Sequence, residues 1–229
     1  MVYDRAVADH ATQRPKQRMP AILRDAISII KQHQRAFIAL NAAFYGLFAL
    51  SMLATVFAPE LQAQFKPSID ESFEKPGLFN TVAGAYASRD LPVAMGMTFL
   101  VNLVVASIAM ATLPTFVVPF VGIPVVLYRA FLWGVMFAPI GPLAVTLVPH
   151  SLTLLIEGQA YVLVAFAAYV QARMFLWPER YGLIRHRDGY MAGAVSTLKL
   201  YPLVMLALAV GAIYEVIEAV YVMPLLLRS

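Results

Sequence analysis

The sequence predicts an all-α fold: a polytopic membrane protein, built as a bundle of about five transmembrane helices with an N-terminal amphipathic interfacial helix. The first observation is composition, because the 229 residues are 61% hydrophobic and only 13% charged, with a mean hydropathy of +0.73. Soluble domains carry about a quarter charged residues. The second observation is that the apolar residues gather in blocks of about 20, the length of a helix that crosses a hydrocarbon core of about 30 Å.

Two regions are expected along the chain. Residues 1–35 form a basic cytoplasmic tail and an amphipathic helix, and residues 36–229 form the transmembrane domain. Within 21–35, apolar side chains such as Ala26 and Ile30 recur at helical spacing opposite charged ones, which predicts a helix lying on the inner leaflet. The alternative is a soluble extension of the first spanning helix. The spanning helices are expected at 36–57, 93–113, 117–137, 151–172 and 203–225.

Positive charge orients these spans, because cytoplasmic flanks of membrane helices carry the excess of Lys and Arg. Residues 1–35 hold seven Lys/Arg and three acids, loop 58–92 holds three and five, and loop 173–200 holds five and two. The N-terminus and loop 173–200 are therefore expected in the cytoplasm, with loop 58–92 and the C-terminus outside. In the outer loop, the spacing of Ser68 and Glu71 predicts the capping box of a short helix.

Polar side chains inside the predicted spans mark the candidate site, because such groups are costly in hydrocarbon and usually face protein partners. They are Asn102, Arg129, Glu157, Glu215 and Glu218, and His150 lies at the outer mouth of the fourth span. From a helix rise of about 1.5 Å per residue, Arg129, Glu157 and Glu215 lie about 12, 10 and 15 Å deep, on three different helices. Arg129 cannot lose its charge in practice. We therefore expect an Arg–Glu cluster, with Arg129 within hydrogen-bonding range of Glu157 or Glu215.

The same residues form two shorter patterns. His150, Thr153 and Glu157 follow a 3–4 spacing and share one helix face, so that Thr153 or water would connect the other two. Glu215 and Glu218 are three residues apart, and we do not expect both carboxyls to ionise in a low dielectric. Three interpretations stay open: ion pairs that hold the bundle together, a proton or ion pathway, and a surface on which a partner helix docks.

No motif of a catalytic or cofactor site is present. HExxH, GxSxG, a P-loop and a dinucleotide-binding glycine motif are absent, and a chain without cysteine has neither disulfides nor thiolate metal sites. His10, His33 and His186 have no partner at metal-ligand spacing. We expect no enzyme activity, no cofactor and no metal. The net charge of +4 is attributed to basic flanks of the spans rather than to nucleic-acid binding.

Several short sequence motifs, referred to below as marks, occur one after another along the predicted spans. "FLVNLVVAS" places Asn102 near the start of the second span, and "YRAFLWG" contains Arg129 and Gly134 in the third. "VPHSLTL" contains Pro149 and His150 at the start of the fourth span, and the last span contains "VIEAV". In this order the marks resemble those of the stage II sporulation protein M family of bacterial membrane proteins, over residues 93–224.

The chain departs from that family's pattern at several positions. Val101 stands at the first residue of an Asn-Asn pair, and Arg129-Ala130 stand where the family has Asn-Gly. Ser151 replaces a glycine and Leu154 replaces a glutamate, for which Glu157, one turn later, is a substitute. Ile217, Glu218 and Ala219 match the family's closing motif. The Arg129 substitution puts any role of that third-span position in question.

The resemblance implies a non-enzymatic membrane scaffold that recruits or anchors partner proteins at the bacterial plasma (inner) membrane. The implied partners are the lipid bilayer and a membrane or cell-envelope protein, with a homo-oligomer left open. The alternative is a permease-like subunit that works with a separate ATPase. The two hypotheses differ in one observable. A water-accessible cavity that reaches Glu157 favours the permease, and a dry packed bundle favours the scaffold.

The topology is testable because the chain has no native cysteine. Cysteines introduced at Ser72 and Ser196 should react with a membrane-impermeant thiol reagent from opposite sides of the membrane, since the charge distribution places 58–92 outside and 173–200 inside. Labelling of intact and permeabilised cells distinguishes the two sides. Labelling of both positions from the same side would exclude the five-span topology.

Overall fold

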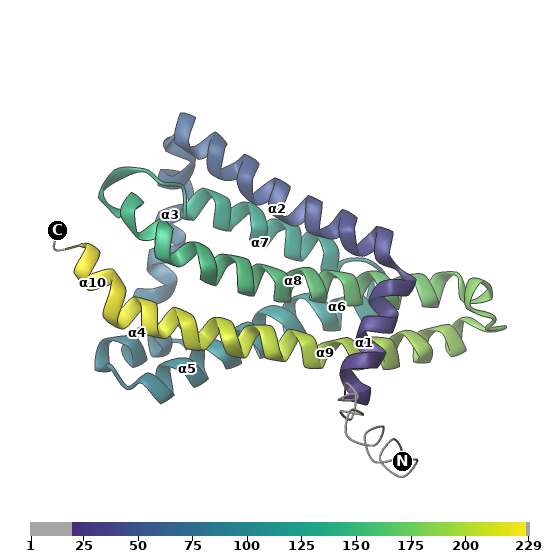
Figure 1. Cartoon of the computed structure of the whole chain (residues 1–229). Helices are drawn as coiled ribbons and strands as arrows, with labels where there is room; N and C mark the ends of the chain where they lie inside the picture. The colour runs from purple at the N-terminus through teal and green to yellow at the C-terminus, as the bar shows by residue number, and fades with distance from the viewer. Residues whose placement is uncertain (1–19, 228–229) are drawn as a thin grey trace, which may run out of the picture.

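In the computed structural model the described residues, 20–227, are almost entirely helical (Figure 1), with the side chains at 72–73 and 142–143 left undescribed. The expected basic tail at 1–19 lies outside this range. Four helical segments are long and apolar enough to cross a membrane, which is consistent with a membrane protein. They are α2 (Gln34–Phe57), Leu91–Val117, Ala144–Leu176 and His186–Leu226. A further apolar helix, α7 (Gly122–Met136), has only 15 residues.

Two of the long segments are interrupted by π-helical stretches. The segment Leu91–Val117 consists of α5 (Leu91–Leu100), a π-helical stretch at Val101–Thr112 and α6 (Leu113–Val117). The last segment consists of α9 (His186–Ile217), a π-helical stretch at Glu218–Val222 and α10 (Met223–Leu226). Such stretches are rare and often occur at functional sites.

The centre of the bundle is α8 (Leu147–Leu176), which follows a short 3₁₀ turn at Gly141–Thr146. It packs along α9 in an antiparallel hairpin, while α7 packs along α2 and also against α8 (Figure 1). Within its apolar window 72% of residues are buried, against 11% for α2. A helix apolar on all sides is stable only when it is surrounded by other apolar surface. Thus α8 is enclosed by the other helices, and α2 presents most of its surface outward.

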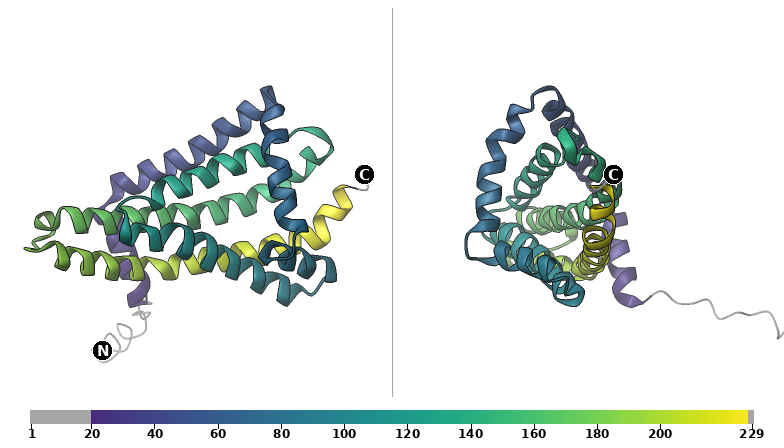
Figure 2. Two further views of the ribbon diagram at one scale, coloured as in Figure 1. Left: turned by 180° about the vertical axis from the view of Figure 1, so that it is seen from behind. Right: turned by 90° about the vertical axis from the view of Figure 1, so that its left-hand side faces the viewer.

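The segment 58–92, expected as a loop, forms two helices, α3 (Glu60–Glu74) and α4 (Leu78–Ser88). They cross the end of the bundle where the C-terminus lies (Figure 2). The predicted capping box is wrong, because Ser68 lies inside α3 and its hydroxyl donates to the carbonyl of Phe65. The effective cap in this region is Asp90, whose carboxylate accepts a hydrogen bond from the backbone N–H of Val93 at the start of α5.

The segment 173–200, expected as a loop, is also mostly helical. Helix α8 continues to Leu176 and α9 begins at His186, so that only 177–185, with a 3₁₀ turn at Pro178–Tyr181, connects them. Ser196 is therefore half-buried inside α9, and Ile184, which is 94% exposed, is the better inner position for cysteine labelling.

The turn between the second and third apolar segments also differs from expectation. The helix runs past Pro114 and ends at Val117. The chain reverses instead at 118–121, where Phe120 adopts a left-handed conformation with φ of 67°.

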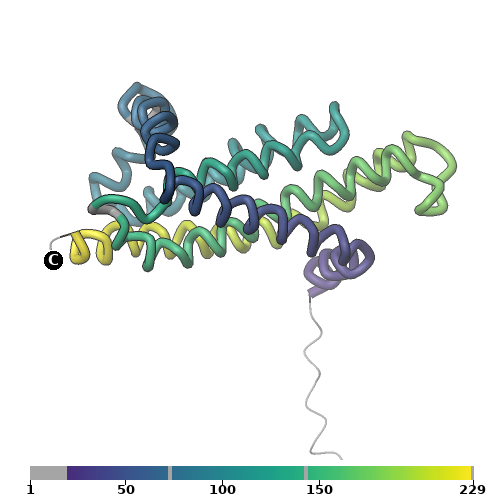
Figure 3. The backbone as a smooth tube through the Cα atoms, turned by 90° about the horizontal axis from the view of Figure 1, so that it is seen from above, coloured from purple at the N-terminus to yellow at the C-terminus, as the bar shows by residue number. Residues whose placement is uncertain are grey.

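Helix α1 (Ala21–Gln32) is separate from α2, because the helical conformation is interrupted at His33. It lies across the bundle at the end opposite the C-terminus (Figures 1 and 3). Ala26 is completely buried against α8 and α9, and Asp25 forms an ion pair with Lys199 on α9 at 3.0 Å. The apolar stripe of α1 therefore packs partly on protein. Its placement on a leaflet remains a proposal.

Close packing of α7 against α2 depends on the missing side chain of Gly134. A Cβ atom there would lie 1.9 Å from Ser51 Oγ and 2.3 Å from the carbonyl oxygen of Phe48. Any side chain at position 134 would require the α2 backbone to move away. By contrast, Gly46 on α2 has no atom within 4 Å of the position its Cβ would take.

We predict that Gly134→Ala lowers the free energy of unfolding by about 1–3 kcal/mol, because the α2 backbone has to move away. Thermal unfolding in detergent measures this loss. The matched control is Gly46→Ala, which should be neutral or stabilising by up to about 1 kcal/mol, since alanine has the higher helix propensity. Equal effects of the two substitutions would contradict the close α2–α7 contact.

Candidate functional site

A cavity of about 390 Å³ lies between α4, the second apolar segment, α7, α8 and α9. Its walls contain five of the six polar residues singled out in the sequence, namely Asn102, Arg129, His150, Glu157 and Glu215. The sixth, Glu218, is hydrogen-bonded to His150. Residues as far apart in the sequence as Asn102 and Glu215 thus line one cavity.

Arg129 does not form the expected ion pair. Its guanidinium donates to Asn102 Oδ1 at 3.1 Å, and Asn102 Nδ2 donates to Glu157 Oε1 at 2.9 Å. Within residues 20–227, no carboxylate oxygen of Glu157 or Glu215 forms an ion pair with Arg129. The physical reason is that a carboxamide both accepts and donates. Asn102 can therefore bridge two charges whose side chains do not meet.

Two aromatic rings complete the surroundings of Arg129. The guanidinium carbon lies 4.3 Å from the ring centre of Tyr161 and 5.3 Å from that of Trp133, which is the geometry of cation–π contacts. The hydroxyl of Tyr161 donates to Asn102 Oδ1 at 2.7 Å. The buried Nε of Arg129 has no hydrogen-bond partner in the structure. The cation is therefore held in place by Tyr161, Trp133 and Asn102, but one of its donors is unused.

Glu215 faces the cavity from α9, close to Glu157 and to Tyr86 of α4. The hydroxyls of Tyr86 and Thr98 are 2.9 Å apart. Burial, followed by the nearby charge of Glu215, raises the pKa of Tyr86 above its usual value. The phenol therefore stays protonated and remains a donor. Helix α4 thus contributes a polar group to the cavity besides covering it.

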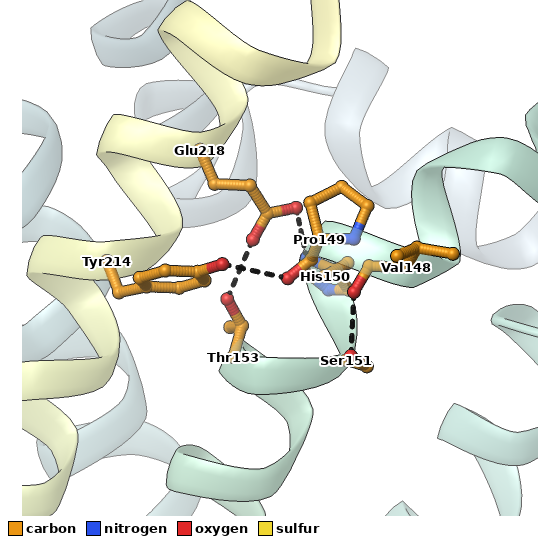
Figure 4. Close-up of polar contacts among 7 residues, drawn as sticks. All are labelled: Val148, Pro149, His150, Ser151, Thr153, Tyr214 and Glu218. Atoms are coloured by element: carbon orange, nitrogen blue, oxygen red, sulfur yellow. Dashed lines mark hydrogen bonds and ion pairs between the residues drawn. The ribbon is translucent and has the colours of Figure 1, made fainter. Parts of the chain in front are cut away.

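A second polar centre surrounds Glu218 (Figure 4), and two of its residues, His150 and Thr153, also line the cavity. The carboxylate is 1% exposed and accepts hydrogen bonds from His150 Nδ1 at 3.2 Å and from Thr153 Oγ1 at 3.0 Å. Tyr214 donates to the carbonyl oxygen of Pro149 at 3.1 Å. Thr153 was expected to connect His150 with Glu157, and it binds Glu218 instead. Glu215 and Glu218 accordingly have different neighbours despite their spacing of three.

Both π-helical stretches begin at this site. Asn102 is the second residue of the first stretch and Glu218 is the first residue of the other. The carbonyl oxygen of Asn102 accepts a hydrogen bond from Ser107 Oγ, five residues later, at 2.7 Å. The wider helical turn thus coincides with the polar side chains, in agreement with the common occurrence of π-helical turns at functional sites.

Sequence reasoning missed several residues of the site. Tyr161 lies four residues after Glu157 and hence on the same helix face, so its helical spacing was an available signal. Trp133, four residues after Arg129, offered the same signal. Tyr86 and Thr98 showed no such signal, because the packing of α4 over the cavity cannot be predicted from the local sequence. Among the described residues, no group of three or more His, Asp or Glu side chains is arranged to hold a metal ion.

The fold and the site together describe a helical protein with membrane-spanning features and a cavity lined by ionisable groups. No protein-family model, curated protein or solved structure matches the chain. The resemblance to the stage II sporulation protein M family thus rests on the short sequence marks alone.

The bridging role of Asn102 predicts the effect of removing its amide. Asn102→Leu should lower the free energy of unfolding by about 3 kcal/mol, because it leaves the charges of Arg129 and Glu157 buried without their shared partner. Thermal unfolding in detergent measures the change. The matched control is Asn41→Leu on α2, since the Asn41 amide donates only to the carbonyl of Phe37 within its own helix. A loss at Asn41 as large as at Asn102 would contradict the bridge.

Proposed function

We propose that this protein is a permease-like membrane protein that binds a small polar solute, with a preference for a positive charge, in the cavity beside Glu157. The observation that carries the proposal is the cavity of about 390 Å³ lined by both Glu157 and Glu215. A scaffold requires no cavity among its ionisable residues. Of the two hypotheses drawn from the sequence, the geometry therefore favours the permease-like one.

The preference for a cation follows from the charges around the cavity. Two carboxyl groups, Glu157 and Glu215, face one permanent cation, Arg129. Arg129 donates to Asn102 and lies over two aromatic rings, and within residues 20–227 it forms no ion pair with either carboxyl. Acidic groups thus outnumber permanently basic ones in this wall, and a cation that enters the cavity is stabilised by the carboxyl groups that ionise. Aromatic rings in the same wall suit an organic cation.

Access to the cavity is proposed from the side of α4, whose Val82, Ala83 and Tyr86 line it. The remaining features of the hypothesis are also proposals. They are a fifth crossing by α7, a bacterial plasma-membrane location with the N-terminus in the cytoplasm, and an energy-supplying ATPase. The α8–α9 hairpin extends beyond the other helices at the end opposite the C-terminus (Figures 1 and 2), and it is the surface on which we would place such a partner.

The scaffold hypothesis is retained as a second candidate because of one feature. Helices α3 and α4 cross the end of the bundle (Figure 2), and the segment around α3 exposes ion pairs of Lys66 with Asp70 and of Lys75 with Glu71. Such a surface suits a soluble cell-envelope partner. The two candidates differ in whether the interior of the cavity is reached by solutes.

Single cysteines in the cysteine-free chain test this difference. Ala83→Cys, in the cavity wall, should react with a cationic methanethiosulfonate at least about tenfold faster than with an anionic one, after correction for their intrinsic rates, because of the acidic lining. Ala165→Cys, 2% exposed in the core of α8, is the buried control and should not react. Adding Glu215→Gln to Ala83→Cys should reduce the cation preference.

Two results would contradict the proposal. Failure of Ala83→Cys to react faster than Ala165→Cys would mean that solutes do not enter the cavity, which favours the scaffold. Rapid reaction without a preference between the cationic and the anionic reagent would retain an accessible cavity but remove the proposed solute class.

A further inference from the structure

A second cavity, of about 520 Å³, lies far from the first one, at the junction of α1 and α2. We call it the basic elbow. It is lined by the basic side chains of Lys31, Arg35 and Arg173, and by His33 and Tyr169, with no aspartate or glutamate among its lining residues. It lies at the end of the bundle opposite the C-terminus (Figure 3). Lys31 and Arg35 are exposed and Arg173 is half-buried, so the three cations surround an open cavity in which an anion would reduce their mutual repulsion.

The cations of the elbow are not neutralised within the described chain. None of Lys31, Arg35 and Arg173 takes part in an ion pair there, whereas Lys199 and Asp25 pair with each other nearby. Arg173 donates to the hydroxyl of Tyr169 at 2.6 Å, which positions the guanidinium without balancing its charge. The positive charge of the elbow is thus available to a ligand.

The elbow is held in shape by His33. Its Nδ1 lies 3.2 Å from the carbonyl oxygen of Ile29, and its Nε2 lies 2.9 Å from the hydroxyl of Tyr181. Burial, and to a smaller extent the charge of Arg173, lowers the pKa of His33. The imidazole therefore stays neutral at pH 7. It fixes the bend between the two helices and leaves the anion to the three cations.

The surroundings of the elbow match an amphiphilic anion better than a soluble one. Ile38, one turn after Arg35 on α2, is 56% exposed. A phosphate in the elbow would therefore have apolar surface directly beside it for acyl chains. Basic pockets at the ends of membrane helices are sites where anionic lipid headgroups bind.

We propose that the basic elbow binds a phosphate-bearing anion, the headgroup of an anionic phospholipid whose acyl chains lie along α2. Lys31, Arg35 and Arg173 contact the phosphate. The bound lipid fixes α1 against the membrane surface and the bundle. The elbow and the cavity beside Glu157 share no lining residue, so this proposal is independent of the solute-binding function.

Native mass spectrometry of the full chain in a neutral detergent tests the proposal. The probes are phosphatidylglycerol, phosphatidylcholine and inorganic phosphate. The wild type should retain one phosphatidylglycerol per chain with at least about tenfold preference over phosphatidylcholine, and the triple variant Lys31→Gln, Arg35→Gln, Arg173→Gln should lose that preference. The matched control removes three basic residues outside the elbow, as Arg24→Gln, Arg185→Gln and Arg187→Gln, and should keep it.

Each alternative outcome has a defined meaning. Loss of the preference in the control variant to the same extent, or its retention in the elbow variant, would overturn the proposal, because binding would follow total charge alone. Displacement of the lipid by millimolar inorganic phosphate would support the phosphate site but assign it to a soluble anion. Thermal unfolding verifies that both triple variants are folded. If the triple variant of the elbow does not fold, the single substitution Arg35→Gln is tested in its place.

Discussion

The structure around the cavity depends on the need to accommodate one charge that cannot be neutralised. Arg129 lies among apolar helices and keeps its proton, so the surrounding chain has to supply compensating groups. Asn102 comes from the second apolar segment, Tyr161 and Glu157 from α8, and Trp133 from α7 itself. Each contact requires a particular rotation of its helix about its own axis. The accommodation of a single cation therefore fixes how these three segments face one another.

The use of an amide between the charges has a functional consequence. A direct pair between Arg129 and Glu157 would saturate both groups and close the space between them. With Asn102 in between, both charged groups remain in the wall of the cavity. The site is then stable enough to be built inside a bundle and still polar enough to bind a solute. Buried polar networks of this kind are favourable when nearly every member is bonded, and the unused Nε of Arg129 is the exception in this network.

The second polar centre has a different character. Glu218 is enclosed, and its hydrogen bonds to His150 and Thr153 join α9 to the start of α8. Glu218 itself is not among the residues that line the cavity. We interpret it as a clamp that joins the beginning of α8 to the end of α9, at the end of the bundle where the C-terminus lies. The cavity beside it can then have a fixed width while α4 covers its mouth.

The sequence by itself determined the helical class, four of the membrane-length segments and the set of polar residues worth examining, because these depend on composition and on helical spacing alone. Helix rise also placed Arg129, Glu157 and Glu215 at one depth. Only the tertiary structure decided which side chains form hydrogen bonds with one another. Depth along a helix says nothing of its rotation, and Asn102 reaches Arg129 from a π-helical stretch that shifts the usual helical register. In 58–92 the sequence predicted only one short helix, and 173–200 was predicted as a loop. Helices outside the long apolar blocks gain their stability from packing on the bundle, as α4 does over the cavity, and local hydropathy does not predict such contacts.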